Sequence, residues 1–219
     1  MRTIFPSRIY SDFVKCEIQN GYLTRTTLKN RDHERAMFEI CAHKWISLDD
    51  GEYGIALMND SKYGHNVTRN QLGITLLRSP KHPDEQADIG EHFFKYSIIP
   101  FKNGSIDLII RKSYELNNNP MVKLGTYLAE NDVFSLFSVS NIKIIVECIK
   151  EAETGEGVIL RMYESSGTYN KTNITSKVNY KEVYETNMLE ENKNVLFKNS
   201  NLISLDFTPF ETKTLLIVF

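Results

Sequence analysis

Short apolar runs, each bounded by polar turn residues, recur along most of the chain. Runs of this length that are rich in β-branched and aromatic residues predict strands, because a helix usually needs about ten residues or more. Two intervening segments, 49–51 and 153–157, contain glycine, which supplies the positive φ that tight hairpin turns require. The predicted strands are 38–43, 53–58, 71–78, 93–100, 142–148, 157–163, 202–207 and 213–218. The sequence therefore predicts an all-β fold.

One segment departs from the strand pattern. Residues 105–116 carry apolar side chains at helical spacing, and the Asn-Asn-Asn-Pro sequence at 117–120 ends that pattern. We expect a single amphipathic helix there. Hydrophobic density falls after it and strands resume near Val133. The sequence therefore predicts two packed all-β units, with the boundary in this region.

Charge and hydropathy limit the partners of the chain. The 219 residues include 26 Lys and Arg against 28 Asp and Glu, for a formal net charge of −2. This balance argues against a nucleic-acid or anionic-membrane partner, since both favour a basic surface. No apolar run approaches the roughly 20 residues that span a bilayer, and the N-terminus has no apolar segment of signal-peptide length. We therefore expect a cytoplasmic protein with no membrane partner.

The residues alone nominate no catalytic group and no metal ligand set. The three cysteines lack a CxxC spacing, and the five histidines lack HxH or HExxH spacing. Cys41 and His43 could offer two ligands from one face of a strand, but a buried, hydrogen-bonded histidine is the commoner role. The chain has neither a GxSxG elbow nor a glycine-rich phosphate loop.

Two loop segments are unusually dense in polar and aromatic residues. Residues 59–64 follow a predicted strand directly and combine the carboxylate of Asp60, the ammonium of Lys62 and the phenol of Tyr63. Residues 77–80 lead into a second such segment at 87–92. Loops carry function more often than the strands that present them. The alternative is that Asp60 and Lys62 pair at the surface while Tyr63 packs against a neighbouring strand.

These segments, in this order, resemble the C-terminal region of glycoside hydrolase family 38, the α-mannosidases. The similarity is strongest to the cytosolic-type and bacterial branch and extends over nearly the whole chain. It is carried by residues 38–39, 43–45, 53–64, 76–80, 87–92, Tyr96, Pro100, 146–147, 160–164, 187–190 and 209–214.

The resemblance implies an architecture. Residues 1–130 would form the last part of a large β-sandwich that includes the amphipathic helix, and residues 131–219 would form a small terminal β-sandwich. Full-length members of the family place retaining chemistry, with an Asp nucleophile and a zinc ion, in an N-terminal catalytic domain. Nothing in this sequence matches that domain, so the resemblance implies no cofactor in this chain and no activity of the chain alone.

The resemblance also implies partners. We expect this region to pack against the catalytic domain of the same enzyme and to line one rim of a cleft that binds a mannose-containing oligosaccharide. We expect the isolated chain, which would lack that domain, to self-associate. A stand-alone carbohydrate-binding or interaction module is the alternative, with Trp45 and the tyrosines as the aromatic groups available for a sugar platform.

Three residues are candidates for the substrate rim. In related branches a strand ends in an Asp-Arg-Arg motif whose second basic residue faces the sugar cleft. Asp60 stands in the acidic place, Ser61 departs from the pattern, and Lys62 replaces the second Arg. Lysine keeps the charge but lacks the planar fork that binds two oxygens at once, which favours a contact with sugar hydroxyls. Tyr63 would add an aromatic face beneath a sugar ring.

Overall fold

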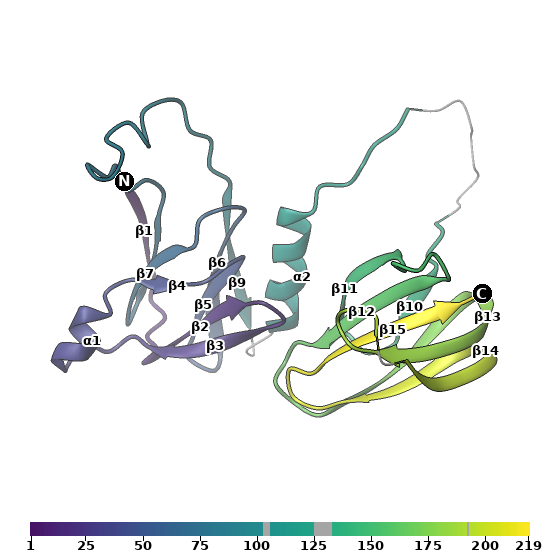
Figure 1. Ribbon diagram of the computed structural model, residues 1–219. Coiled ribbons are helices and arrows are strands. Elements are labelled where there is room, and N and C mark those ends of the chain that lie inside the picture. Colours follow the sequence, from purple (N-terminus) through teal and green to yellow (C-terminus); the bar gives the residue numbers. More distant parts are fainter. Residues whose placement is uncertain (103–105, 125–132, 192) are drawn as a thin grey trace. The chain divides into compact units, whose positions relative to one another are not determined.

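The computed structural model describes residues 1–102, 106–124, 133–191 and 193–219. The chain divides into two compact units, Met1–Met121 (unit 1) and Val122–Phe219 (unit 2), and strands dominate both (Figure 1). The all-β prediction is therefore confirmed. The boundary predicted after residue 130 lies in 125–132, outside the described residues, and the division into domains 1–130 and 131–219 stays a prediction.

Unit 1 contains two antiparallel sheets. A four-stranded sheet has the order β1-β8-β7-β4 and a five-stranded sheet has the order β3-β2-β5-β6-β9. The strands of the first are β1 (Arg2–Pro6), β8 (Gln71–Thr75), β7 (Gly64–Thr68) and β4 (Ile40–Cys41). Those of the second are β3 (Gly21–Thr26), β2 (Phe13–Ile18), β5 (Trp45–Asp49), β6 (Tyr53–Asn59) and β9 (Tyr96–Lys102).

One hydrophobic core joins the two sheets of unit 1. Side chains alternate between the faces of a strand, so each sheet contributes every second residue to this core. Cys16, Ile46 and Leu57 come from the five-stranded sheet, and they cluster with Leu72 and Ile74 of the four-stranded sheet. Burial of such a side chain contributes roughly 1.5–3 kcal/mol. The shared core makes unit 1 a β-sandwich.

The predicted amphipathic helix is present as α2 (Ile106–Asn117), and Ser105, where the prediction began, lies outside the described residues. The helix packs against β5 and β6 and buries Ile109, Ile110 and Ser113. A second helix, α1 (Asp32–Ala36), is not predicted by the sequence. It buries no side chain, so it carries no helical hydrophobic pattern. In the described ranges, neither helix is long and apolar enough to cross a membrane.

Unit 2 is built on one six-stranded antiparallel sheet with the order β10-β13-β15-β12-β11, in which β14 also pairs with β13. Its strands are β10 (Phe137–Val139), β11 (Ile144–Glu151), β12 (Val158–Glu164), β13 (Asn170–Thr186), β14 (Asn194–Phe207) and β15 (Thr212–Val218). The long strand β13 pairs with β10 near Ile174 and with β15 from Glu182 onward. Because β13 changes partners along its length, the sheet encloses its own core, which includes Leu160, Ile203 and Leu215.

The predicted strands differ in how well they agree with the observed ones. The predictions 53–58, 157–163 and 213–218 coincide closely with β6, β12 and β15. The prediction 38–43 is wrong for most of its length, because only Ile40 and Cys41 pair with a neighbouring strand. The sequence also misses β1, β2, β3, β5, β7, β10 and β13.

Candidate functional site

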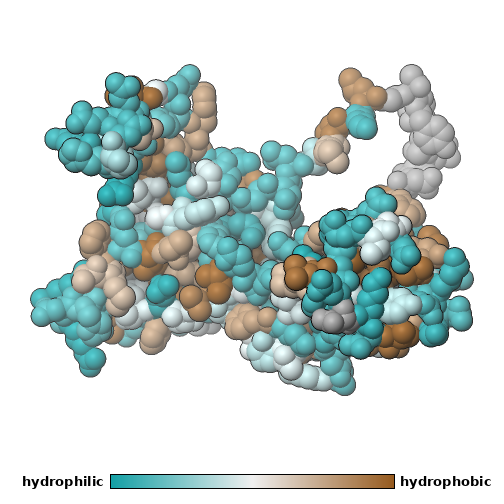
Figure 2. Space-filling model, in the orientation of Figure 1, coloured by the Kyte–Doolittle hydropathy of each residue, from teal (hydrophilic) through white to brown (hydrophobic). Residues whose placement is uncertain are grey.

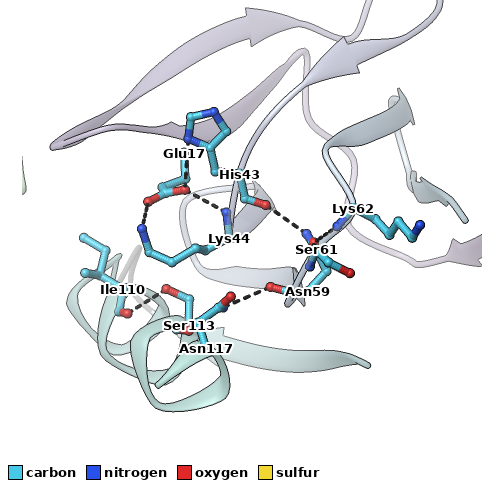
Figure 3. A network of polar contacts seen from close by, with 9 residues as sticks. All are labelled: Glu17, His43, Lys44, Asn59, Ser61, Lys62, Ile110, Ser113 and Asn117. Atoms are coloured by element: carbon cyan, nitrogen blue, oxygen red, sulfur yellow. Dashed lines mark hydrogen bonds and ion pairs between the residues drawn. The ribbon is translucent and has the colours of Figure 1, made fainter. Parts of the chain in front are cut away.

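The loop between β6 and β7 carries the three rim candidates, and the last residue of β6 fixes its shape. Asn59 is 1% exposed. Its Oδ1 accepts hydrogen bonds from the backbone N–H groups of Ser61 at 3.1 Å and Lys62 at 2.6 Å, while its Nδ2 donates to the carbonyl oxygen of His43 at 2.9 Å (Figure 3). A short amide side chain that bonds the backbone two residues ahead stabilises a tight turn. Asn59 therefore determines the backbone path of the loop.

The base of this loop is tied to the sheet and to α2. The backbone N–H of Asn59 donates to the carbonyl of Lys44 at 3.0 Å, and Nδ2 of Asn117, the last residue of α2, donates to the carbonyl of Asn59 at 3.0 Å. Lys44 is held in turn by the buried carboxylate of Glu17, which accepts from its backbone N–H and from its Nζ, both at 2.7 Å. The Nζ of Lys44 also lies 4.6 Å from the ring centre of Tyr114. These contacts join strand, loop and helix in one polar network (Figure 3).

The three candidate side chains point to different neighbours. Asp60 is exposed and its Oδ1 accepts from the hydroxyl of Ser61 at 3.1 Å. Lys62 is half-buried and extends away from the Glu17 and Lys44 side chains (Figure 3). Tyr63 is 55% exposed, and its ring is 5.1 Å from that of His43. Within the described ranges Asp60 contacts Ser61 and Lys62 lies over Phe94, and no ion pair joins the two, so the structure does not show the surface pair that the alternative interpretation requires.

The second polar segment noted in the sequence lies beside this loop. The backbone N–H of Asp60 donates to the carbonyl of Lys95 at 3.2 Å, and Nζ of Lys62 lies 4.9 Å from the ring centre of Phe94. The hydrogen bond from the Ser79 backbone N–H is the main cause that lowers the pKa of Asp88, and the nearby Lys62 ammonium also lowers it. The fold thus places two segments about 30 residues apart in sequence on one surface.

The resulting surface offers groups that suit hydroxyl ligands. An ammonium donates up to three hydrogen bonds and a carboxylate accepts several, so Lys62 and Asp60 can each bind hydroxyl oxygens or protons of a polyol. The exposed ring of Tyr63 offers an apolar face. The loop backbone that carries these groups is already fixed by Asn59, which reduces the entropy lost on binding.

Each of the two units matches a known protein family. Residues 1–86 match the glycosyl hydrolases family 38 C-terminal domain, and residues 143–215 match the glycosyl hydrolases family 38 C-terminal beta sandwich domain. The chain belongs to glycoside hydrolase family 38. The resemblance carried by the sequence motifs is confirmed, and the small sandwich expected at the C-terminus corresponds to the second matched domain.

Individual relatives of this family 38 chain are considerably longer. Alpha-mannosidase 2C1 of Mus musculus is 34% identical and aligns with 100% of the chain but with 22% of its own length. Alpha-mannosidase G of Dictyostelium discoideum is 39% identical over 90% of the chain and 19% of its own length. The solved structure of an alpha-mannosidase from Enterococcus faecalis V583 shares the fold, with a TM-score of 0.76 at 16% identity, and covers 100% of this chain and 25% of that one. The chain spans about a fifth of the length of the curated relatives it matches.

Sequence reasoning misjudged one aromatic group of this family 38 region and missed several supporting residues. Trp45, the only tryptophan, is 1% exposed in the core of unit 1 and therefore cannot serve as a sugar platform. The roles of Asn59, Glu17 and Phe94 were not predicted. An amide directly after an apolar strand was the one available signal for Asn59, since such residues often stabilise turns.

The described residues do not form a metal site. No group of three His, Cys, Asp or Glu side chains in those ranges could hold a metal ion. His43, half of the Cys41–His43 pair considered from the sequence, has its Nδ1 4.0 Å from a carboxylate oxygen of Glu17, while Cys41 is exposed. These residues do not fit a zinc centre.

Replacing Asn59 by Ala is expected to destabilise unit 1 by about 2 kcal/mol, because the backbone groups of His43, Ser61 and Lys62 lose their buried partner. Urea unfolding followed by the fluorescence of the buried Trp45 measures this change. Asp60→Ala in the same loop serves as the control and should shift stability by less than about 0.5 kcal/mol, since Asp60 is exposed. Equal effects of the two variants would contradict the role assigned to Asn59.

Proposed function

We propose that this chain is the C-terminal β region of an α-mannosidase, an enzyme that hydrolyses terminal α-linked mannose. Both matched domains are C-terminal domains of family 38, and several relatives are named alpha-mannosidases. The matched part makes up about a fifth of those relatives. The retaining, metal-dependent chemistry would reside in a separate catalytic portion, and this region alone would be inactive.

In this proposal the Asn59–Tyr63 loop lines one rim of the sugar cleft. The observation that supports it is the fixed loop itself, because the buried Asn59 amide holds the backbone of Ser61 and Lys62. Asp60, Ser61 and Lys62 stand where the resemblance expects the family's Asp-Arg-Arg motif, and Tyr63 follows them. Lys62, placed over Phe94, would donate hydrogen bonds to sugar hydroxyls. Asp60 would accept them, and Tyr63 would pack against the apolar face of a sugar ring.

The partners follow from the same proposal. Apolar residues interrupt the hydrophilic surface of unit 1 (Figure 2), and the segment beside the loop includes Ile89 at 77% and Phe93 at 85% exposure. Such side chains would pack against the catalytic portion, and without it they would favour self-association of the chain. A zinc ion would bind to the catalytic portion, since the residues described here do not fit one. We place the enzyme in the cytoplasm, like the cytosolic-type branch that its motifs resemble.

Lys62→Ala in the full-length enzyme is expected to lower kcat/KM for an α-mannoside about tenfold. A change of this size corresponds to the loss of one hydrogen bond from a charged donor. Initial rates across substrate concentrations measure the change. Lys112→Ala, which removes an exposed ammonium from α2, is the matched control and should leave kcat/KM unchanged. Thermal unfolding of both variants checks that the fold is intact.

Two results would contradict this proposal. Unchanged kcat/KM in the Lys62→Ala enzyme would remove the loop from the substrate rim. Robust hydrolysis of an α-mannoside by the isolated 219-residue chain, with zinc supplied, would show that the chemistry does not depend on a separate catalytic portion.

A further inference from the structure

A polar pocket lies in unit 1, at the other end of the β5–β6 hairpin from the Asn59–Tyr63 loop. Its volume is about 540 Å³, within the range of small-molecule sites. Asp49 at the pocket pairs with Gly54, whereas Trp45 pairs with Met58 next to the loop. The whole length of the hairpin therefore separates the pocket from the rim candidates.

Backbone hydrogen bonds hold the wall of this pocket in place. The segment before β2 forms one side, and its Ser11 N–H donates to the carbonyl of Arg69 at 2.9 Å. The Thr27 N–H donates to the carbonyl of Asp12 at 2.9 Å, and the Thr27 hydroxyl donates to the carbonyl of Ser11 at 2.6 Å. These hydrogen bonds fix the wall of the pocket, so little ordering entropy is lost when a ligand binds.

Two ion pairs supply its polar groups. Arg69 donates from Nε at 3.0 Å and from Nη2 at 2.7 Å to Oδ1 of Asp12. Lys15 donates from Nζ to Oδ2 of Asp49 at 2.9 Å. In the described part of the chain these contacts leave Oδ2 of Asp12 and Oδ1 of Asp49 as acceptors, next to the remaining N–H groups of the two cations. An acceptor beside a donor suits a hydroxyl group, which both donates and accepts.

Two exposed aromatic rings complete the pocket. Tyr10 is 65% exposed and Phe13 is 59% exposed, and both line the same cavity as the ion pairs. The electron-rich face of an aromatic ring attracts the positively polarised C–H groups of a sugar's apolar face. Apolar rings beside paired charges are therefore suited to a ligand that has one apolar face and a rim of hydroxyls.

The charge balance excludes strongly charged ligands. Asp12 pairs with Arg69 and Asp49 pairs with Lys15, so an anion would meet carboxylates and a metal cation would meet a guanidinium and an ammonium. We propose that this pocket binds a neutral hexopyranose, such as a sugar residue of an oligosaccharide, separately from the Asn59–Tyr63 loop. The inference rests on this pocket alone and does not depend on the proposed catalytic partner.

Titration of the ¹⁵N-labelled 219-residue chain with methyl α-mannopyranoside, followed by amide NMR shifts, tests the site. We expect saturable shifts at millimolar sugar, centred on Ser11, Phe13, Gly51 and Arg69. Tyr10→Ala should weaken binding about tenfold. Asp12→Asn, which keeps the size of the side chain but removes its charge, should also weaken it. Tyr169→Ala is the matched control, because it removes a tyrosine of similar exposure from unit 2 and should leave binding unchanged.

Each alternative result overturns the proposal. Absence of saturable shifts in the pocket amides would show a solvated groove, and shifts confined to residues 60–63 would place sugar binding at the rim loop alone. A parallel titration with sulfate that shifts the pocket amides at lower concentration than the sugar would identify an anion site. Amide spectra of the variants without ligand establish that Tyr10→Ala and Asp12→Asn remain folded.

Discussion

Replacing Glu164 by Ala is expected to destabilise unit 2 by about 4 kcal/mol. Glu164 is the last residue of β12 and is completely buried. Its carboxylate is the common acceptor for two loops, the one that leads into β13 and the one that leads into β15. Removing the side chain would take a shared acceptor away from several partly buried backbone N–H groups, and each lost hydrogen bond to a charged acceptor costs roughly 1.5–3 kcal/mol.

The hydrogen bonds of this carboxylate explain the size of the effect. Oε1 accepts from the backbone N–H of Ser166 at 2.8 Å, from the hydroxyl of Ser166 and from Nδ2 of Asn170 at 2.9 Å. Oε2 accepts from the backbone N–H groups of Gly167 at 2.7 Å, Thr168 at 3.2 Å and Phe210 at 3.1 Å. Burial acts to raise the pKa of Glu164, but the donors outweigh it and the net pKa is lowered. The charged form is therefore the one that stabilises the fold.

Urea unfolding followed by amide hydrogen exchange separates the two units and measures the effect. Amides of Leu160 and Leu215, in the core of unit 2, should exchange faster in Glu164→Ala, while those of Ile46 and Leu57 in unit 1 should be unaffected. Glu164→Gln should lower the stability of unit 2 by less than Glu164→Ala does, since glutamine keeps one acceptor oxygen. The exposed Glu153, replaced by Ala, is the control and should cost less than about 0.5 kcal/mol. If Glu164→Ala loses no more stability than the Glu153→Ala control, the role assigned to the Glu164 carboxylate is wrong.

Strands were predictable from the sequence where apolar residues form a continuous run and were missed where polar residues interrupt it. In β6 and β15 most inward positions are apolar, so the runs are visible. In β13 the alternation of burial is clear, yet Thr172 and Ser176 occupy buried positions. Polar residues on the inner face erase the hydrophobic pattern, because their burial depends on hydrogen bonds that the sequence does not display.

The three rim candidates stay a prediction, and the sequence gives them only as positions. The motif resemblance supplies Asp60 and Lys62, and Tyr63 is the next residue. The contact of Lys62 with Phe94 and the hydrogen bond from Asn117 to Asn59, by contrast, join residues 32 and 58 positions apart. Such contacts depend on how the strands and the helix pack, so they cannot be predicted from the local sequence. The same holds for the pocket near Arg69, whose ion pair with Asp12 spans 57 positions.

Acid is expected to destabilise unit 1 through His65, by about 3 kcal/mol at the low end of its titration. His65 lies on β7, is completely buried, and neither ring nitrogen has a hydrogen-bond partner within the described ranges. Burial lowers its pKa from 6.5 to about 4, and weaker contacts with backbone groups of Gly73 and Ala42 oppose the shift only in part. The folded protein therefore holds this histidine neutral.

The direction in which pH changes the stability of unit 1 follows from proton uptake by His65. Between pH 6.5 and about 4 the unfolded chain protonates His65 and the folded chain does not, so stability falls as the pH falls through this window. Glu164 adds to the loss only at lower pH in unit 2, because its folded pKa lies below its ordinary value of 4.5. Above pH 6.5 the neutral His65 no longer contributes a pH dependence.

Replacing His65 by Leu should therefore flatten the stability profile of unit 1 between pH 6.5 and about 4. At neutral pH the variant should be at least as stable as the parent chain, since two unsatisfied buried nitrogens are exchanged for apolar atoms. Urea midpoints from Trp45 fluorescence measure both effects, because the only tryptophan is buried in unit 1. The exposed His92, replaced by Leu, is the control and should keep the steep profile of the parent. If the parent and His65→Leu profiles run parallel, another group governs the acid sensitivity of this sandwich, and His65 is protonated without cost in the folded state.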